Sequence, residues 1–528
     1  MTSPTQNPYD AIPYQSGSFP QTHPQHLAML ATLFGMSPAH VEKCRVLELG
    51  CAEGGNIIPM AVSLPNSRFL GIDYSAKQID IGQQTIRELG LQNIRLAQQN
   101  ILDVNSSLGT FDFIIAQGIF SWVPEDVRIK VLEICQKHLA PQGVAYISYN
   151  AKPGGFIRTM VREMLNFHLE KYDGFEERIS AGRKLLDFLT ESAAEQNPAY
   201  HAILEWERQH VRQSLDHQLA HDLLEENHQP FFISEFMEQA SKYDLQYLGD
   251  ANFSTMLPRN FSQPVFDQLK QYAKSMLEME QYMDFVRNRS FRQTLLAHAA
   301  VPLNHQLDPA IVSRFYISGS LSPKEESSEP YSNRMEVFQT PSGQEIQSNV
   351  PLVKAAFAIL REQWPGNISF SNLLTHARSR LLQSETADNS PDRDFAELTN
   401  SLMTCFTVSA IELSVRSLAC GPVPKTRIST SRLTRYQAAK GEIVTNDRHE
   451  TVRLDAWQRE LLLAMDGSCT RDELIVKFSK RMPNGQTLIG HGPEAMPVPH
   501  FSTETLRHKI DAGLQQLASL GLVRRVPS

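Results

Sequence analysis

The chain has 528 residues, of which 41% are hydrophobic and 20% are charged. These proportions are typical of a folded globular protein and exclude a disordered or fibrous chain, and the length predicts three or four domains at about 150 residues each. The net charge of −8 conceals a basic C-terminal part, because residues 421–528 carry 16 Lys and Arg against 11 Asp and Glu.

The cysteines and the apolar runs indicate the compartment. The six cysteines form no CxxC pair, so neither a disulfide framework nor a thiolate zinc site is indicated. The first 25 residues contain no apolar run of signal-peptide length, and no stretch approaches the roughly 20 apolar residues that span a bilayer. We therefore expect a cytoplasmic protein with reduced cysteines and no membrane insertion.

Between residues 24 and 155, short apolar runs alternate with helical stretches. The predicted strands are 45–49, 68–72, 94–98, 111–116 and 144–149. The predicted helices are 55–64, 76–89 and 124–139. This alternation predicts parallel βαβ units, with a ligand bound beyond the carboxyl ends of the strands.

A glycine-rich turn, Glu48-Leu49-Gly50-Cys51-Ala52-Glu53-Gly54, follows the first predicted strand. Glycine lets the backbone bend sharply and approach a ligand, and the amides at the next helix start favour an anionic group. The turn also fits a loose dinucleotide fingerprint, and it could be an ordinary strand-to-helix turn that binds nothing. Asp73 closes the second strand, where its carboxylate can accept hydrogen bonds from two ribose hydroxyls, as in NAD proteins.

The end of this domain helps to choose among these three interpretations of the turn. There, a helix is followed by Ala140-Pro141-Gln142-Gly143 and then by a strand. With this feature the sequence resembles the class I S-adenosylmethionine-dependent methyltransferases, whose turn E-x-G-x-G-x-G corresponds to Glu48 through Gly54. The resemblance implies S-adenosylmethionine as cofactor and S-adenosylhomocysteine as product. It implies a cofactor site formed by Glu48, Gly50, Cys51, Ala52, Gly54, Asn56, Asp73, Tyr74, Asn100, Ile101 and Gln117.

Two of these positions depart from the family pattern. Asn100 stands where many members have an acidic residue for the adenine amine, and its amide oxygen can accept the same hydrogen bond without the charge. Ala52 replaces the common middle glycine, a modest change if its φ is negative.

Further motifs narrow the resemblance. The segments 14–24, Ser121-Trp122-Val123-Pro124 and Ser148-Tyr149-Asn150 resemble bacterial methyltransferases with a methyltransferase regulatory domain, and so do 221–227, 230–232 and 245–249. That family includes protein lysine methyltransferases acting on bacterial outer-membrane proteins. Phe156 comes one residue later than the aromatic residue that relatives often carry after Pro-Gly, which would alter the mouth of the substrate pocket.

This resemblance implies catalytic and substrate-binding residues near the strand ends. The catalytic candidates are Tyr149, Asn150 and His23, and the substrate-binding candidates are Tyr14, Phe19 and Trp122. Each has an alternative structural role. Trp122 and Phe19 could belong to the core, and His23 could cap the helix that begins near Pro24.

Two helical patterns are explained better by packing than by metal or cofactor binding. His217 and His221 lie four residues apart, as a helical metal site would require, but an amphipathic helix explains the spacing and no metal is predicted. The apolar stripe of Met160, Val161, Met164 and Leu165, with His168, predicts packing against a helical neighbour or a second subunit of a homodimer.

The C-terminal half contains a predicted hairpin, 335–339 with 345–347, and two similar segments. The first has helices 352–363, 369–381 and 395–409 and a strand 411–415, and the second has helices 456–465, 471–481 and 503–520 and a strand 522–526. Three short helices ending in a strand suggest winged-helix-like modules. The third helices carry few basic residues, so we prefer protein docking over nucleic-acid binding.

Together these features predict an α/β Rossmann-like methyltransferase domain followed by mostly α-helical accessory domains with winged-helix-like modules. The predicted divisions are 1–155 (catalytic), 156–215 (helical connector), 216–300 (regulatory), 301–420 and 421–528 (winged-helix-like). The leading hypothesis is a bacterial methyltransferase that modifies lysine side chains of a protein. The alternatives are a small-molecule or natural-product methyltransferase and a DNA-bound regulator that senses the cofactor.

Overall fold

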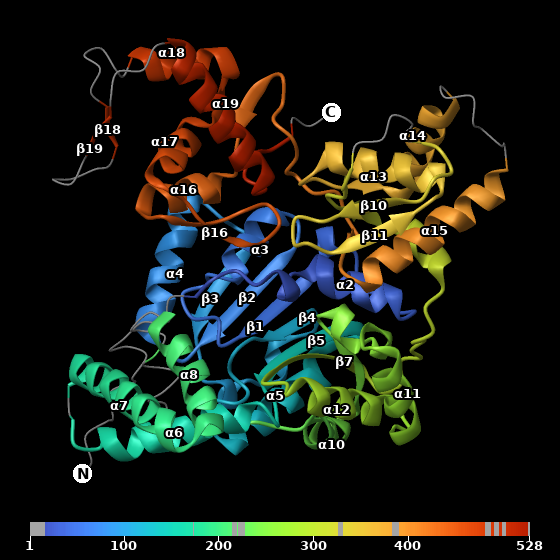
Figure 1. Cartoon of the computed structure of the whole chain (residues 1–528). Helices are drawn as coiled ribbons and strands as arrows, with labels where there is room; N and C mark the ends of the chain where they lie inside the picture. Colours follow the sequence, from blue (N-terminus) through green and yellow to red (C-terminus); the bar gives the residue numbers. More distant parts are fainter. Residues whose placement is uncertain are drawn as a thin grey trace. The chain divides into compact units, whose positions relative to one another are not determined.

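The computed structural model describes residues 16–172, 174–213, 219, 227–325, 331–382, 390–480, 487–489, 496–498 and 503–525. The chain forms two compact units (Figure 1). Unit 1 contains Ser16, Met36–Ala61 and Pro65–Leu303, and unit 2 contains Gly17–Gly35, Val62–Leu64 and Asn304–Ser528.

A seven-stranded sheet organises unit 1 in the order β3-β2-β1-β4-β5-β7-β6. Its strands are β1 (Arg45–Leu49), β2 (Arg68–Asp73), β3 (Ile94–Gln98), β4 (Phe111–Ala116), β5 (Leu139–Asn150), β6 (Leu245–Asp250) and β7 (Phe291–His298). The first five strands are parallel to one another, and β7 is antiparallel to both β5 and β6. The predicted Rossmann-like fold is confirmed.

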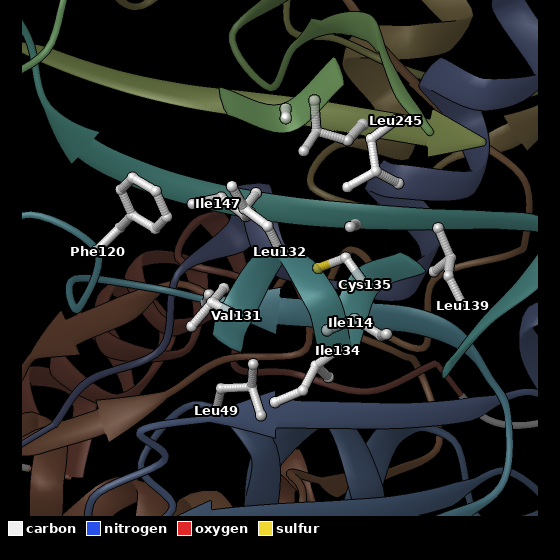
Figure 2. Close-up of a cluster of buried hydrophobic side chains, with 14 of the residues drawn as sticks. Leu49, Ile114, Phe120, Val131, Leu132, Ile134, Cys135, Leu139, Ile147 and Leu245 are labelled. Atoms are coloured by element: carbon white, nitrogen blue, oxygen red, sulfur yellow. The ribbon is translucent and has the colours of Figure 1, made fainter. Parts of the chain in front are cut away.

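The core of unit 1 lies between this sheet and the helices packed on it. The helices near the parallel strands are α3 (Ile57–Ser63), α4 (Ala76–Leu89) and α5 (Glu125–His138). Figure 2 shows side chains of α5 gathered against residues of several strands. They include Val131, Leu132 and Cys135 of α5 with Leu49, Ile114, Ile147 and Leu245. This packing fixes the strand ends at which the site is built.

The predicted boundary at residue 155 does not separate two compact units. Strands β6 and β7 come from the segment 216–300 that we assigned to a separate regulatory domain, yet they complete the same sheet. The edge of β5 offers unpaired backbone groups, and β7 satisfies them from Ala145↔Leu296 to Asn150↔Phe291. The sheet of unit 1 is therefore built from residues on both sides of a helical insertion.

That insertion consists of α6 (Gly155–Leu169), α7 (Phe175–Gln196) and α8 (Pro198–Gln213). Val161 and Leu165 belong to their shared buried core, with Met160 and Met164 packed against it, so the predicted packing role of this stripe is confirmed. His217 and His221 lie outside the described residues. After the insertion come α10 (Ile233–Ser241), α11 (Gln263–Tyr272) and α12 (Met276–Arg287).

A buried ionic cluster ties α12 to β7. Arg292 is 0% exposed, and its guanidinium donates to Asp284 at 2.7 and 2.8 Å and to Glu280 at 2.8 Å. Arg289 donates to Asp250 at 2.7 Å. Because a buried charge without a partner is costly, these pairs keep α12 on the sheet.

Unit 2 contains the N-terminal helix α2 (Pro24–Leu33) and the two repeated segments. The first segment has α13 (Pro351–Gln363), α14 (Phe370–Leu382), α15 (Pro391–Thr407) and β13 (Glu412–Ser414). The second has α16 (Arg432–Lys440), α17 (Ala456–Ala464), α18 (Arg471–Lys480) and α19 (Thr503–Ser519). Leu373 of α14 and Leu474 of α18, which lie in the helices predicted at 369–381 and 471–481, are both fully buried.

The short strands of unit 2 form small sheets. They are β8 (Tyr316–Ser318), β9 (Ser322–Pro323), β10 (Glu336–Gln339), β11 (Glu345–Ser348), β12 (Ile368–Ser369), β14 (Arg427–Ser429), β15 (Ile443–Thr445), β16 (Thr451–Arg453), β17 (Asp466–Thr470), β18 (Thr487–Ile489) and β19 (Met496–Val498). The predicted hairpin is confirmed, because β10 and β11 pair antiparallel. The predicted strand 522–526 is reduced to one bridge, Cys420↔Arg524, within the described residues. Among those residues, no helix combines the length and apolar character that crossing a membrane requires.

Candidate active site

The candidate site lies where the parallel strands of unit 1 end. Strands β1, β2, β4 and β5 run in register, so their carboxyl ends meet at one edge of the sheet. Ligands of open α/β sheets bind outside this edge. The glycine-rich turn, Asp73, Gln117 and Asn150 all follow or end these strands.

Gly50 begins the turn and requires glycine for two reasons. Its φ is +71°, in the left-handed region. A Cβ atom built on it would lie 2.6 Å from a methyl carbon of Ile119, which is too close for a carbon contact. Gly54 also has a positive φ, +83°, and the backbone between the two glycines therefore folds tightly over the end of β1.

Ala52 departs from our expectation, because its φ is +48° and not negative. A non-glycine residue in this region costs roughly 1–2 kcal/mol. The amide of Ala52 donates to Oδ2 of Asp73 at 2.8 Å, which holds the turn in this conformation. The substitution of the middle glycine is therefore not neutral for the backbone.

Asp73 joins the turn to the end of β2. Its carboxylate accepts from the amides of Ala52 at 2.8 Å and Ser75 at 2.9 Å. An ionised carboxylate has about four acceptor positions, so hydroxyl groups of a ligand can still be bound. The next residue, Tyr74, is 63% exposed, which leaves its ring face accessible for stacking on a planar base.

Glu48 and Asn56 form a buried pair beneath the turn. Nδ2 of Asn56 donates to Oε1 of Glu48 at 2.7 Å, while Oε2 has no hydrogen-bond partner within the described part of the chain. Burial and, to a smaller degree, the charge of Asp73 raise the pKa of Glu48 to about 8, against the lowering effect of Asn56. The carboxyl group is therefore mainly neutral at pH 7 and retains a hydrogen-bonding atom for a polar ligand.

Asn100 and Gln117 are both engaged in local hydrogen bonds. Oδ1 of Asn100 accepts from the amide of Leu102 at 3.0 Å and caps the short helix η3 (Ile101–Asp103). Oε1 of Gln117 accepts from the hydroxyl of the buried Tyr146 at 2.5 Å. These bonds fix both amides at the strand ends, beside the half-buried Ile101.

Asn150 lies in a polar and aromatic group that includes a residue missed in the sequence, His228. Nδ2 of Asn150 lies 2.7 Å from Nε2 of His228, and Nδ1 of His228 lies 3.3 Å from Oγ1 of Thr159. The ring of Trp122 lies 4.8 Å from that of His228, and the guanidinium of Arg162 lies 5.0 Å from the Trp122 ring.

The protonation of His228 follows from these contacts. The hydroxyl of Thr159 donates to the carbonyl of Gly155 at 3.0 Å, so it accepts from Nδ1–H of His228 while Nε2 accepts from Asn150. Burial and the positive charges of Arg162 and Arg158 lower the pKa of His228 to about 4. The imidazole is therefore neutral at pH 7. No periodic pattern surrounds it in the sequence, and only its place between two family-like motifs could have indicated it.

Tyr149 is not placed as a catalytic residue should be. Its side chain is 1% exposed and stacks on Phe236 with the ring centroids 4.4 Å apart. Its hydroxyl bonds Thr294 at 3.1 Å, within the buried core. Tyr149 and Ile147 point to the same face of β5, toward the core, so this geometry favours a packing role for Tyr149 over the predicted catalytic one.

His23 caps a helix, which was its alternative role. Nδ1 accepts from the amide of Gln25 at 3.2 Å at the start of α2, and Nε2 lies 3.1 Å from Oγ of Ser63. The ring is 3% exposed and belongs to unit 2, and its contacts favour the structural role over the predicted catalytic one. Phe19, also in unit 2, is half-buried, and Tyr14 lies outside the described residues.

Three family models match the chain. "Methyltransferase domain" matches residues 40–226, "Predicted methyltransferase regulatory domain" matches 215–298, and "PKMT, C-terminal winged helix domain" matches 429–522. The last match covers the second of the two repeated segments.

A full-length relative and a solved structure extend this match. The uncharacterized protein RP789 of Rickettsia prowazekii is 35% identical over 493 residues, covering 92% of this chain and 87% of the relative. The structure of PKMT2 from Rickettsia typhi in complex with AdoHcy has a TM-score of 0.84 at 26% identity, covering 97% of this chain and all of that one. The chain belongs to this methyltransferase family. It is an S-adenosylmethionine-dependent methyltransferase.

The geometry of the strand edge fits this cofactor. The tight turn from Gly50 to Gly54 brings backbone groups to the end of β1, and the acceptor positions of Asp73 suit ribose hydroxyls. The unpartnered Oε2 of Glu48 provides a buried polar atom under the turn. The methyltransferase thus carries, at one edge of its sheet, the groups that an adenosyl cofactor requires.

Proposed function

We propose that this methyltransferase transfers methyl groups to lysine side chains of a protein substrate. The observation that carries the proposal is the likeness to PKMT2 over 97% of the chain, which includes the accessory regions as well as the catalytic sheet. The match of residues 429–522 to the PKMT winged-helix domain supports the same substrate class.

We assign the cofactor to the edge of β1, β2 and β4. The backbone of Gly50, Cys51, Ala52 and Gly54 would meet the methionine part, and Asp73 and Tyr74 would bind the ribose and the adenine. Glu48 and Asn56 would support the turn from below, and Asn100, Ile101 and Gln117 would line the remaining edge. S-adenosylmethionine, when bound, supplies an electrophilic methyl group.

A lysine amine must lose its proton before it can accept a methyl group. The group formed by Asn150, Trp122 and His228 would receive the lysine, with the indole ring of Trp122 packing along its aliphatic stem. Arg162, next to Trp122, adds a positive charge that lowers the pKa of an incoming amine. His228 is neutral and accepts the hydrogen bond of Asn150, so it positions that amide and does not act as a base at this geometry.

Some of the described basic residues at the end of unit 2 contact groups of the same unit. Arg524 donates to Asp447 at 2.6 Å, Arg507 to Asp472 at 3.3 Å, and Lys509 lies 4.9 Å from the ring of Trp457. The Arg507 pair is exposed and therefore weak, but the charge of Arg524 is engaged within the unit, which favours protein contacts over DNA binding at this position.

The test is to incubate the purified methyltransferase with methyl-labelled S-adenosylmethionine and a lysate of its source cells, and then to separate proteins from small molecules. We expect label in discrete protein bands, on lysine by peptide mass analysis, and its loss in Asp73→Ala. Label confined to small molecules would replace the proposal with a metabolite enzyme. Salt-sensitive DNA binding with no transfer would replace it with a cofactor-sensing regulator.

A further inference from the structure

A cavity of about 460 Å³ opens between α10 and α12, over β6. Met237 of α10, Leu277 of α12 and Leu245 and Tyr247 of β6 give it an apolar lining. All of these residues belong to unit 1. Figure 1 shows α10 and α12 on the same side of β7. We call this cavity the α10–α12 groove.

The charged residues at the groove are acidic. Glu238 and Glu278 line it and are exposed, and no Lys or Arg is among its described lining residues. Lys242 reaches Glu238 at 3.6 Å, but both side chains are largely exposed, and a pair of this kind is weak. The groove therefore combines an apolar interior with a negative rim, which complements an apolar residue next to a basic one.

Beyond the groove, the start of α10 leads toward the end of β5. Oγ of Ser234 donates to Oε1 of Gln281 at 3.1 Å, which links α10 and α12 beside the cavity. One helical turn after Gln281 on α12, the ring of Phe285 lies 5.7 Å from that of Phe232. The amide of Phe231 donates to the carbonyl of Asn150 at 2.9 Å, so the chain just before α10 adjoins the site.

Aromatic rings along this path already bind cations of the chain itself. Nζ of Lys152 lies 5.1 Å from the centroid of Phe232 and 5.6 Å from that of Phe156. The half-exposed ring of Phe156 lies 6.4 Å from Phe232 and continues the row. Ring faces that hold one ammonium group also suit the ammonium groups of a basic polypeptide.

We propose that the α10–α12 groove docks a segment of the protein substrate, in which an apolar side chain enters the cavity and a neighbouring Lys or Arg meets Glu238 and Glu278. This inference rests on the proposed function and names how its substrate is chosen. The rise from Phe232 to Glu238 along α10 is roughly 9 Å. An extended chain covers that distance in about three residues, so the docking pair lies about three to six residues from the target lysine.

The probe is a fluorescein-labelled peptide of Ser, Thr and Gly with one lysine and a Leu-Arg pair five residues after it. Two control peptides replace Leu by Ala or Arg by Glu. The variant is Glu238→Lys with Glu278→Lys in the full-length protein, and both residues are exposed. Because Glu278 also accepts from the amide of Lys274 at 2.7 Å at the start of α12, thermal unfolding checks that the variant is folded. The control variant, Asp267→Lys with Glu195→Lys, changes the net charge equally at exposed residues that do not line the groove.

We expect anisotropy titrations to give at least about fivefold weaker binding for each control peptide and for the groove variant, with a strong salt dependence that the control variant retains. Equal affinity for all three peptides, or equal losses in both variants, would overturn the proposal. A change in oligomeric state of the groove variant without a change in peptide affinity would assign the groove to a second copy of the chain.

The two proposals fail differently. If lysate proteins are methylated on lysine but the groove variant labels the same bands at the same rate, the groove proposal fails and the proposed function stands. If the peptide binds as expected but no lysine in any protein is labelled, the proposed function fails. Binding of S-adenosylmethionine should be equal in wild type and both variants, which excludes damage to the cofactor site.

Discussion

The side chains of Asn150 and His228 meet at 2.7 Å and join the end of β5 to the loop before α10. The strand end belongs to the part of the chain that precedes the helical insertion, and the loop belongs to the part that follows it. The candidate substrate side of the site is therefore assembled from both.

We predict that His228→Ala lowers kcat/KM about tenfold to a hundredfold, because Asn150 loses the acceptor that orients it. The affinity for S-adenosylmethionine should change little. His228→Gln keeps an acceptor and should restore part of the rate, which a merely structural role would not give. His168→Ala is the matched control, since that ring lies against Tyr172 of the same helical region. An unchanged rate in His228→Ala would refute the positioning role.

Substitutions at the turn residues Gly50 and Ala52 should change the stability of the protein in opposite directions. Ala52→Gly removes a side chain from the left-handed region and should be neutral or stabilising by up to about 1 kcal/mol after the entropy cost of glycine. Gly50→Ala meets Ile119 and should destabilise by about 2–4 kcal/mol and abolish cofactor binding. Thermal unfolding and calorimetric titration with S-adenosylmethionine measure both effects. Destabilisation by Ala52→Gly would contradict the strain at this residue.

Glu48 should make stability depend on pH. Its pKa rises from 4.5 when unfolded to about 8 when folded, so the folded protein holds the proton more tightly. Stability contributed by this group is present below pH 4.5 and is lost as the pH rises toward 8 and beyond. Glu48→Gln keeps an acceptor for Asn56 and cannot ionise, so it should gain stability over wild type as the pH rises.

Melting curves at pH 6, 7, 8 and 9 measure this difference. Asp80→Asn, an exposed carboxylate on α4, is the control and should show no such trend. A constant difference between Glu48→Gln and wild type across these pH values would show that burial does not hold the proton on Glu48.

Removing the cation of the buried cluster around Arg292 should lower the free energy of unfolding far more than removing a surface ion pair. Arg292→Met leaves Asp284 and Glu280 without their cation and should cost about 3–5 kcal/mol. Arg212→Met removes an exposed pair with Asp187 and should cost less than about 1 kcal/mol. Hydrogen exchange of the β7 amides measures the local effect. Equal protection of β7 in the two variants would contradict a role of the cluster in holding that strand.

The sequence predicted the parallel part of the sheet closely. The bounds of β1, β3, β4 and α4 agree with the predicted ranges, because buried parallel strands form short apolar runs between glycine and polar turns. The partners of β5 could not be predicted in this way. Strand β7 pairs with β5 across more than a hundred residues, and its buried Arg292 interrupts the apolar pattern.

The differences between the predicted and the observed site have separate causes. The alternation of side chains along β5 places Tyr149 with Ile147 on the core side, so this periodicity favours packing where the sequence motif favours catalysis. The positive φ of Ala52 depends on the bond from its amide to Asp73, a contact that no local propensity encodes. His228 was missed because its partners Asn150 and Thr159 are distant in sequence.

The place of β7 between β5 and β6 has a consequence during synthesis on the ribosome. The whole segment from Asn150 to His298 must be translated before β5 gains its second neighbour, which takes about ten to thirty seconds at bacterial rates. During that interval the nascent chain presents an unpaired β5 edge, which favours association with other chains. The helical insertion thus sets a delay between translation of the glycine-rich turn and the pairing of β7 with β5.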